Sequence, residues 1–166
     1  QTPNPKPQTP NPLYMKYFKL KGRISDFMNI AKIRLSFMNA MMPISGLYAV
    51  TENLDYRICF SLIIGNFCLA SSSQIMGQIY EQKQDSIMER TKNRPLITKN
   101  ISNKEAIIFS LSTFIIGNTT LLISLPLKSV IVSNMAFLLY YIYLRGKQRT
   151  PFSLYLGAIV GVLPII

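Results

Sequence analysis

Two carboxylates lie four residues apart at the end of a long apolar run, in the stretch YEQKQD. If that run is a helix that continues through Asp85, then Gly77, Glu81 and Asp85 fall on one face, because residues four apart stack along a helix. Neighbouring carboxylates repel each other unless a cation lies between them, and Mg²⁺ commonly binds through one or two carboxylates together with substrate phosphate. The spacing therefore predicts that Glu81 and Asp85 hold Mg²⁺.

Three cations, Arg90, Lys92 and Arg94, follow within nine residues of Asp85. The planar guanidinium group of arginine matches the oxygens of a phosphate group. Pro95 has no N–H to donate, so we expect it to stop or kink a helix and to fix where these cations point. Two interpretations remain open from the spacing alone: a diphosphate site, and a solvated loop whose charges pair with one another and mark membrane topology.

The composition is that of a membrane protein. Of 166 residues, 49% are hydrophobic and only 15% are charged, whereas soluble domains carry about 25% charged residues. A bilayer core needs ~20 mostly apolar helical residues. The candidate spans are Ile33–Val50, Ile58–Tyr80, Ala106–Leu125, Val130–Leu144 and a fifth from Phe152 to Ile166.

A soluble helical bundle is the alternative fold, but its helices should have polar outer faces, and residues 107–125 contain no charged residue at all. Glycine, serine and asparagine recur within the spans and suit close helix packing in a membrane. The predicted fold class is therefore all-α: a multi-pass transmembrane bundle with about four to five helices in this chain.

Lysine and arginine are distributed unevenly between the two sides of these spans. Residues 1–36 hold seven, residues 81–105 hold six and residues 145–149 hold three, whereas the two other connections hold only Arg57 and Lys128. By the positive-inside rule, the N-terminus and the 81–105 loop lie on the same side of the membrane. The net charge of +11 is mainly an orientation signal, so we expect no nucleic-acid partner.

Two regions are expected along the chain: residues 1–26, a proline-rich arm and a partly disordered segment that leads into the first span, and residues 27–166, the membrane domain. The arm repeats QTPNP, a composition that favours extended, solvated backbone. The two cysteines, Cys59 and Cys68, imply no disulfide framework. Histidine is absent, so any chemistry must use carboxylates, Lys, Arg, Tyr or a bound metal.

The stretch YEQKQDSIMERTKNRPLITKNIS resembles the first acidic motif and the following loop of the protoheme IX farnesyltransferase (heme O synthase) family of intramembrane prenyltransferases. That family reads approximately N-x-x-x-(D/E)-x-x-x-D-x-x-M-x-R-T-x-x-R-P-L-x-x-G-x-I-S. The matching residues are Glu81, Asp85, Met88, Arg90, Thr91, Arg94, Pro95, Leu96, Ile101 and Ser102.

Two weaker stretches agree with the family in the same order. AKIRLS at 31–36 resembles T-K-P-R-L-S, and residues 143–164 resemble a later loop and helix at Tyr143, Lys147, Thr150, Gly157, Gly161 and Pro164. The resemblance covers roughly residues 28–166, about the first half of a family member. It therefore implies that this chain forms half of a larger prenyltransferase bundle.

The resemblance implies transfer of a farnesyl group from farnesyl diphosphate to heme b. Glu81 and Asp85 would be the catalytic and Mg²⁺-binding residues, and Arg90, Lys92 and Arg94 would bind the diphosphate. Lys32 and Arg34 would assist from the same side of the membrane. With no histidine as an axial ligand, heme b would be held as a substrate by shape, by contacts to its propionates, or by Tyr or Met.

The sequence departs from the family pattern in ways that open a second interpretation. Gly77 and Ser153 each stand where the family has asparagine, and the second acidic motif of the family does not occur in these residues. Either the chain belongs to a longer enzyme, or it is a degenerate homologue that serves as a structural subunit of a respiratory complex, near cytochrome c oxidase. On the second interpretation we expect the 166-residue form to be inactive alone.

A small transporter or channel is the third class considered, but such proteins usually place charged residues within their spans. Frequent Lys, Asn and Ile suggest an AT-rich genome, and Glu81 is a eukaryote-like choice at its position in the motif. We therefore expect the mitochondrial inner membrane, with membrane lipid as a partner and with the N-terminus and the 81–105 loop on the matrix side.

Overall fold

The computed structural model describes residues 12–51, 55–146, 155 and 157–158. Five helices follow one another in this part of the chain, which contains no strand: α1 Pro12–Ile30, α2 Ile33–Val50, α3 Tyr56–Asp85, α4 Asn103–Ser124 and α5 Leu127–Gly146. The predicted all-α class is confirmed. Residues 1–11, and with them most of the proline-rich arm, lie outside the described residues, as does nearly all of the predicted fifth span.

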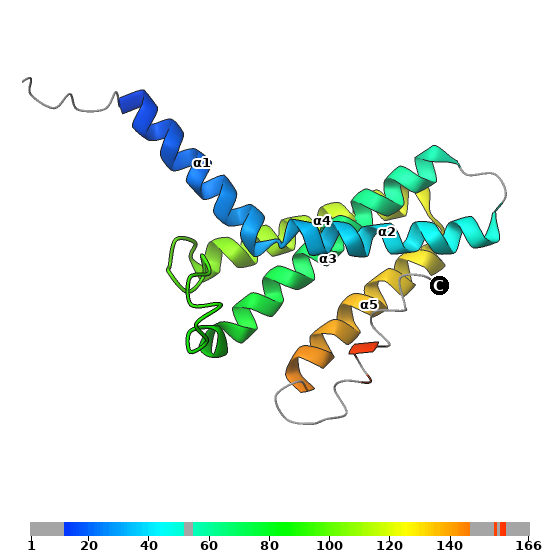
Figure 1. Cartoon of the computed structure of the whole chain (residues 1–166). Helices are drawn as coiled ribbons and strands as arrows, with labels where there is room; N and C mark the ends of the chain where they lie inside the picture. Colours follow the sequence, from blue (N-terminus) through cyan, green and yellow to red (C-terminus); the bar gives the residue numbers. More distant parts are fainter. Residues whose placement is uncertain (1–11, 52–54, 147–154, 156, 159–166) are drawn as a thin grey trace, which may run out of the picture.

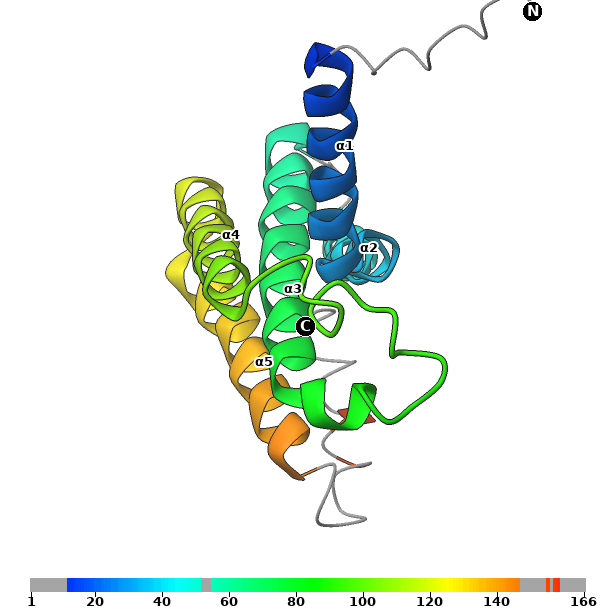
Figure 2. The same cartoon turned by 90° about the vertical axis from the view of Figure 1, so that its left-hand side faces the viewer.

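Helix α3 is the central element. It packs most extensively against α4, then against α2, and it also contacts α5 and α1. Figure 2 shows α4 and α5 on one side of α3 and α1 and α2 on the other. Because every other helix touches α3, the residues along its length face several different neighbours.

Three of the described helices are long and apolar enough to cross a membrane: α3, α4 and α5. The first predicted span is also a helix with the predicted bounds, Ile33–Val50, but it is not one of these three. Its sequence contains Arg34, Asn39 and Pro43, which lower its mean hydropathy. The chain is therefore a membrane protein in which three of the four spans expected within the described helices have the length and composition to cross a bilayer.

Helices α3 and α4 approach closely because glycine occupies both sides of their contact. A Cβ atom built on Gly117 would lie 2.9 Å from the backbone oxygen of Gly65. Hydroxyl groups bridge the same interface, with Ser61 2.6 Å from Ser124 and Ser72 2.9 Å from Ser110. Small residues and interhelical hydrogen bonds replace the hydrophobic driving force that is missing between helices in lipid.

The corner between α1 and α2 is fastened to α3 by polar contacts. Gln78 donates to the backbone oxygen of Ile30 at 2.6 Å, and Lys32, which has a left-handed backbone with φ of 45°, donates to Gln74 at 3.2 Å. Arg23 of α1 forms an ion pair with Glu105 at the start of α4. From this corner, α1 runs away from the other helices toward its N-terminal end (Figure 1).

Candidate functional site

Helix α3 continues to Asp85, as the sequence predicted, so Gly77, Glu81 and Asp85 lie on one face of it. We call these three residues the acidic face. Gly77 is buried, Glu81 is half-buried and Asp85 is buried, with 6% of its surface exposed. A carboxylate in the last turn of a helix faces the negative end of the helix dipole. Burial of Asp85 at this position is therefore unfavourable unless a cation compensates it.

That cation is Arg94, which forms an ion pair with Asp85 across nine residues of chain. The Arg94 side chain is 23% exposed and the Asp85 side chain 8% exposed, so the pair is largely shielded from water. The structure thus pairs Arg94, a predicted diphosphate-binding residue, with Asp85, a predicted metal ligand.

The loop after α3 is built from turns that carry Arg94 back to the helix. Thr91 is 3% exposed and donates through its hydroxyl to the backbone oxygen of Asp85 at 2.8 Å. The N–H of Arg94 then donates to the oxygen of Thr91 at 3.0 Å. Leu96 and Ile101 are buried in a cluster with Ile75 and other residues of α1, α3 and α4, which anchors the far end of the loop.

The expectation that Pro95 would stop the helix is wrong, because α3 already ends at Asp85. At that end, the Thr91 hydroxyl donates to the Asp85 oxygen, one of the last-turn carbonyl groups that have no partner within the helix. Pro95 is buried in the loop, where its carbonyl oxygen accepts from the N–H of Ile101 at 3.3 Å.

The remaining predicted residues are not gathered around Asp85. Arg90 is exposed and, within the part of the chain that the structure describes, makes no hydrogen bond or ion pair. Lys92 pairs instead with Glu89 at 3.2 Å on the surface. Lys32 lies at the α1–α2 corner against Gln74, and Arg34 is exposed on α2.

Tyr140 of α5 is a neighbour of the acidic face that the sequence did not indicate. Its hydroxyl lies 3.2 Å from the position of a Cβ atom on Gly77, and its side chain hydrogen-bonds with Gln74. The hydroxyl therefore takes up space that a side chain at position 77 would occupy. It lies 63 positions beyond Gly77 in the sequence, so no local periodicity could have identified it.

The donor set suits Mg²⁺ only in combination with a phosphate group. Among the described residues, no group of three or more Cys, Asp or Glu side chains is placed to hold a metal ion. Glu81 and Asp85 offer the hard carboxylate oxygens that Mg²⁺ prefers, and Mg²⁺ sites often contain one or two carboxylates plus substrate phosphate. The residues present therefore fit a site in which protein carboxylates and a substrate phosphate hold Mg²⁺ together. They do not fit a site made by protein ligands alone.

Comparison with known proteins gives a consistent result. A sequence model described as the UbiA prenyltransferase family matches residues 38–166. The chain is 31% identical over 151 residues to a protein of Flavobacterium johnsoniae named protoheme IX farnesyltransferase, covering 89% of this chain and 50% of the relative. Proteins with the same name from Ehrlichia canis, at 31% identity with 86% and 49% coverage, and from Christiangramia forsetii, at 29% with 86% and 48%, are also similar.

The chain spans about half the length of the curated relatives it matches. The family match begins at Met38, so it includes the acidic face of α3 and the loop with Arg94 but not Lys32 or Arg34. No solved structure matches the chain.

Proposed function

Because the chain belongs to the UbiA prenyltransferase family, we propose that it takes part in transferring a farnesyl group from farnesyl diphosphate to a vinyl group of heme b. The product is heme O. The relatives named protoheme IX farnesyltransferase support this choice of substrates. Since they are about twice as long, the proposal concerns the protein that contains this chain.

The observation that carries the proposal is the ion pair between Asp85 and Arg94. It joins a carboxylate suited to Mg²⁺ and a guanidinium suited to phosphate at one end of a membrane-spanning helix. A diphosphate needs both partners, because its negative charges are poorly solvated near the membrane core. The arrangement supports ionisation of an allylic diphosphate at the bilayer surface, with the farnesyl chain extending into the membrane.

In this reaction the protein acts mainly by electrostatic stabilisation of the departing diphosphate. The C1–O bond of farnesyl diphosphate breaks and its electron pair leaves with the diphosphate, while the vinyl π electrons form the new bond to C1. Water captures the carbocation left on the vinyl group, and a proton is released. Arg94 would donate N–H groups to the departing phosphate oxygens, and preorganised donors of this kind lower the barrier where charge develops.

Glu81 and Asp85 would hold Mg²⁺, which when bound supplies positive charge that stabilises the diphosphate as a leaving group. Arg90, exposed on the same loop, would be a second donor to phosphate, and Lys92, Lys32 and Arg34 would contribute a positive potential on that side of the membrane. We propose the mitochondrial inner membrane because Lys, Asn and Ile are frequent and Glu81 is a eukaryote-like choice in the motif; the cation distribution then puts this side in the matrix.

The test uses the full-length protein in lipid nanodiscs with Mg²⁺, farnesyl diphosphate and heme b, and detects the prenylated heme by mass spectrometry. The Arg94→Gln variant should lose at least ~100-fold in turnover, on the order expected for removal of a donor to developing charge. Lys83→Gln is a matched control, because Lys83 is an exposed cation in the last turn of α3. Equal losses in both variants, or no product from the unmodified protein, would contradict the proposal.

A second candidate function rests on Gly77, which offers no side-chain oxygen beside Glu81. It is a structural role in a respiratory complex near cytochrome c oxidase, in which the helices are retained for their packing. Purification of the native protein under mild conditions distinguishes the two: stable association with oxidase subunits together with no heme product would favour the structural role, and product formation would exclude it.

A further inference from the structure

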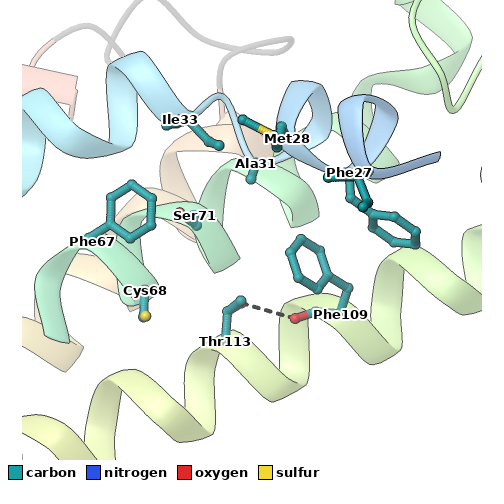
Figure 3. Close-up of a pocket in the computed structure, with 10 residues that line it drawn as sticks. Phe27, Met28, Ala31, Ile33, Phe67, Cys68, Ser71, Phe109 and Thr113 are labelled. Atoms are coloured by element: carbon teal, nitrogen blue, oxygen red, sulfur yellow. Dashed lines mark hydrogen bonds between the residues drawn. The ribbon is translucent and has the colours of Figure 1, made fainter. Parts of the chain in front are cut away.

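An apolar cavity of about 310 Å³ lies where α1, α2, α3 and α4 meet. Figure 3 shows it beneath the C-terminal end of α1, with Ile33, Met28 and Phe27 above, Phe67 at one side and Phe109 on α4. Neither Glu81 nor Asp85 lines it. Its volume is at the lower end of the range for small-molecule sites, which typically combine apolar walls with few polar groups.

Ser71 is the polar group that matters in this cavity. It is 2% exposed, it lines the cavity, and its hydroxyl has no hydrogen-bond partner among the described residues. The adjacent serines are satisfied, since Ser72 pairs with Ser110 and Ser73 donates to the oxygen of Ala70 at 2.8 Å. A buried hydroxyl without a partner is costly, so the Ser71 hydroxyl is available to a ligand that carries a hydrogen-bond acceptor.

The cavity continues onto an exposed apolar stripe along α1. Leu20, Ile24 and Met28 are each at least half exposed and are spaced four residues apart, which places them on one face. Ile24 and Met28 also line the cavity. The helix sequence holds four Lys or Arg against a single Asp. An apolar stripe on a basic helix is the arrangement of helices that lie in the membrane interface and attract anionic lipids.

The polar contacts of the α1–α2 corner favour a position of Ser71 near the membrane interface. Lys32, at the corner where the chain turns from α1 into α2, contacts Gln74, and Gln74 is about one helical turn from Ser71. We take the corner and α1 to lie at the membrane surface, so that α3 leaves the bilayer near Gln74, before the end of the Ile58–Tyr80 span expected from hydropathy. Ser71 then lies about one helical turn below the surface. In a phospholipid, the ester carbonyl groups occupy this depth, between the headgroup and the acyl chains.

We propose that this cavity binds an acyl chain of an anionic phospholipid, with an ester carbonyl accepting from the Ser71 hydroxyl and the headgroup near the cations of α1, including Lys21. The hydrocarbon part of an isoprenoid offers no acceptor to Ser71, which is why a phospholipid fits better. The lipid fastens α1 to the bundle at the corner that precedes α2. The inference is independent of the proposed prenyl transfer, because it uses none of the acidic-face residues.

The experiment is native mass spectrometry of the purified full-length protein after exchange into phosphatidylglycerol or phosphatidylcholine. Phosphatidylglycerol should remain bound at higher occupancy and raise the midpoint of thermal unfolding. Ser71→Ala should weaken retention of phosphatidylglycerol by about five-fold, the effect of one neutral hydrogen bond. Without lipid, the same variant should be no less stable than the unmodified protein, since it removes an unsatisfied hydroxyl.

Ser71→Leu, which fills the cavity, should abolish retention, and Lys21→Gln should reduce the preference for phosphatidylglycerol. Ser73→Ala is the matched control, because the Ser73 hydroxyl is satisfied within its own helix and does not line the cavity. Equal retention of both lipids, unchanged retention in Ser71→Ala, or displacement of the lipid by farnesyl diphosphate without Mg²⁺ would each overturn the proposal.

Discussion

At the scale of single residues, Asp85 combines two unfavourable circumstances, burial and a position at the C-terminal end of a helix. Arg94 relieves both, and it does so from a loop whose path depends on the Thr91 hydroxyl. The loop is thus held against the end of α3 by specific contacts and does more than carry topological charge. Substitutions at this pair should affect stability as well as any diphosphate chemistry.

The first prediction concerns the stability of the loop. Asp85→Asn removes the partner of a mostly buried guanidinium and should lower the free energy of unfolding by roughly 1–3 kcal/mol. Arg94→Gln added to Asp85→Asn should recover part of this loss, since two neutral amides can hydrogen-bond. Glu89→Gln is the control, because it breaks an exposed pair and should change stability by less than about 1 kcal/mol. The measurement is thermal unfolding in detergent, and additive effects of the first two substitutions would contradict the expected coupling.

A second prediction follows from Tyr140. Its hydroxyl lies 3.2 Å from the position of a Cβ atom on Gly77, so under the proposed function it supplies an oxygen where the family pattern has asparagine. Tyr140→Phe should weaken Mn²⁺ affinity by about 10-fold or more, as for other outer contacts of a metal site. Binding is measured by electron paramagnetic resonance with Mn²⁺ in place of Mg²⁺ and with pyrophosphate present, because the carboxylates fit a metal ion only together with phosphate.

Gly77→Asn combined with Tyr140→Phe should restore that affinity, because the phenylalanine leaves room for the amide. Gly77→Asn alone should disturb packing, since its Cβ would lie 3.2 Å from the Tyr140 hydroxyl. Unchanged Mn²⁺ affinity in Tyr140→Phe would show that the hydroxyl only fills space.

At the scale of helices, the contact between α3 and α4 depends on the absence of side chains at Gly65 and Gly117. Gly117→Ala should destabilise the protein by about 1–3 kcal/mol, as overpacking does, because the new methyl group would meet backbone. Gly22→Ala in α1 is a matched control with nothing within 4 Å of the added atom, and it should be neutral or stabilising by up to ~1 kcal/mol. Thermal unfolding compares the two, and equal effects would mean that the close approach is not important for stability.

At the scale of the whole molecule, the cation distribution predicts that the loop after α3 and the start of α3 lie on opposite sides of the membrane. Single cysteines at Arg57 and Thr98, both exposed, are introduced after the free cysteines Cys59 and Cys68 are replaced by serine. A membrane-impermeant maleimide should label each from a different side of sealed vesicles. Labelling of both from one side would contradict a membrane-spanning α3.

The sequence alone determined most of the helical framework and the order of residues on it. Hydropathy placed Ile33–Val50, and helical periodicity placed Gly77, Glu81 and Asp85 on one face of α3. These features depend on residues that are near one another in the chain, so their pattern is local. The resemblance to the prenyltransferases likewise rests on a continuous motif, and the family match bears it out.

The tertiary structure decided which of those residues meet. It selected Arg94 rather than Arg90 or Lys92 as the partner of Asp85, because the turn held by Thr91 sets the direction of the loop. It brought Tyr140 from α5 against Gly77, and it left Ser71 without a partner among the described residues in a cavity made by four helices. Such contacts join residues far apart in the chain, and they depend on how closely the helices pack, which no short stretch of sequence specifies.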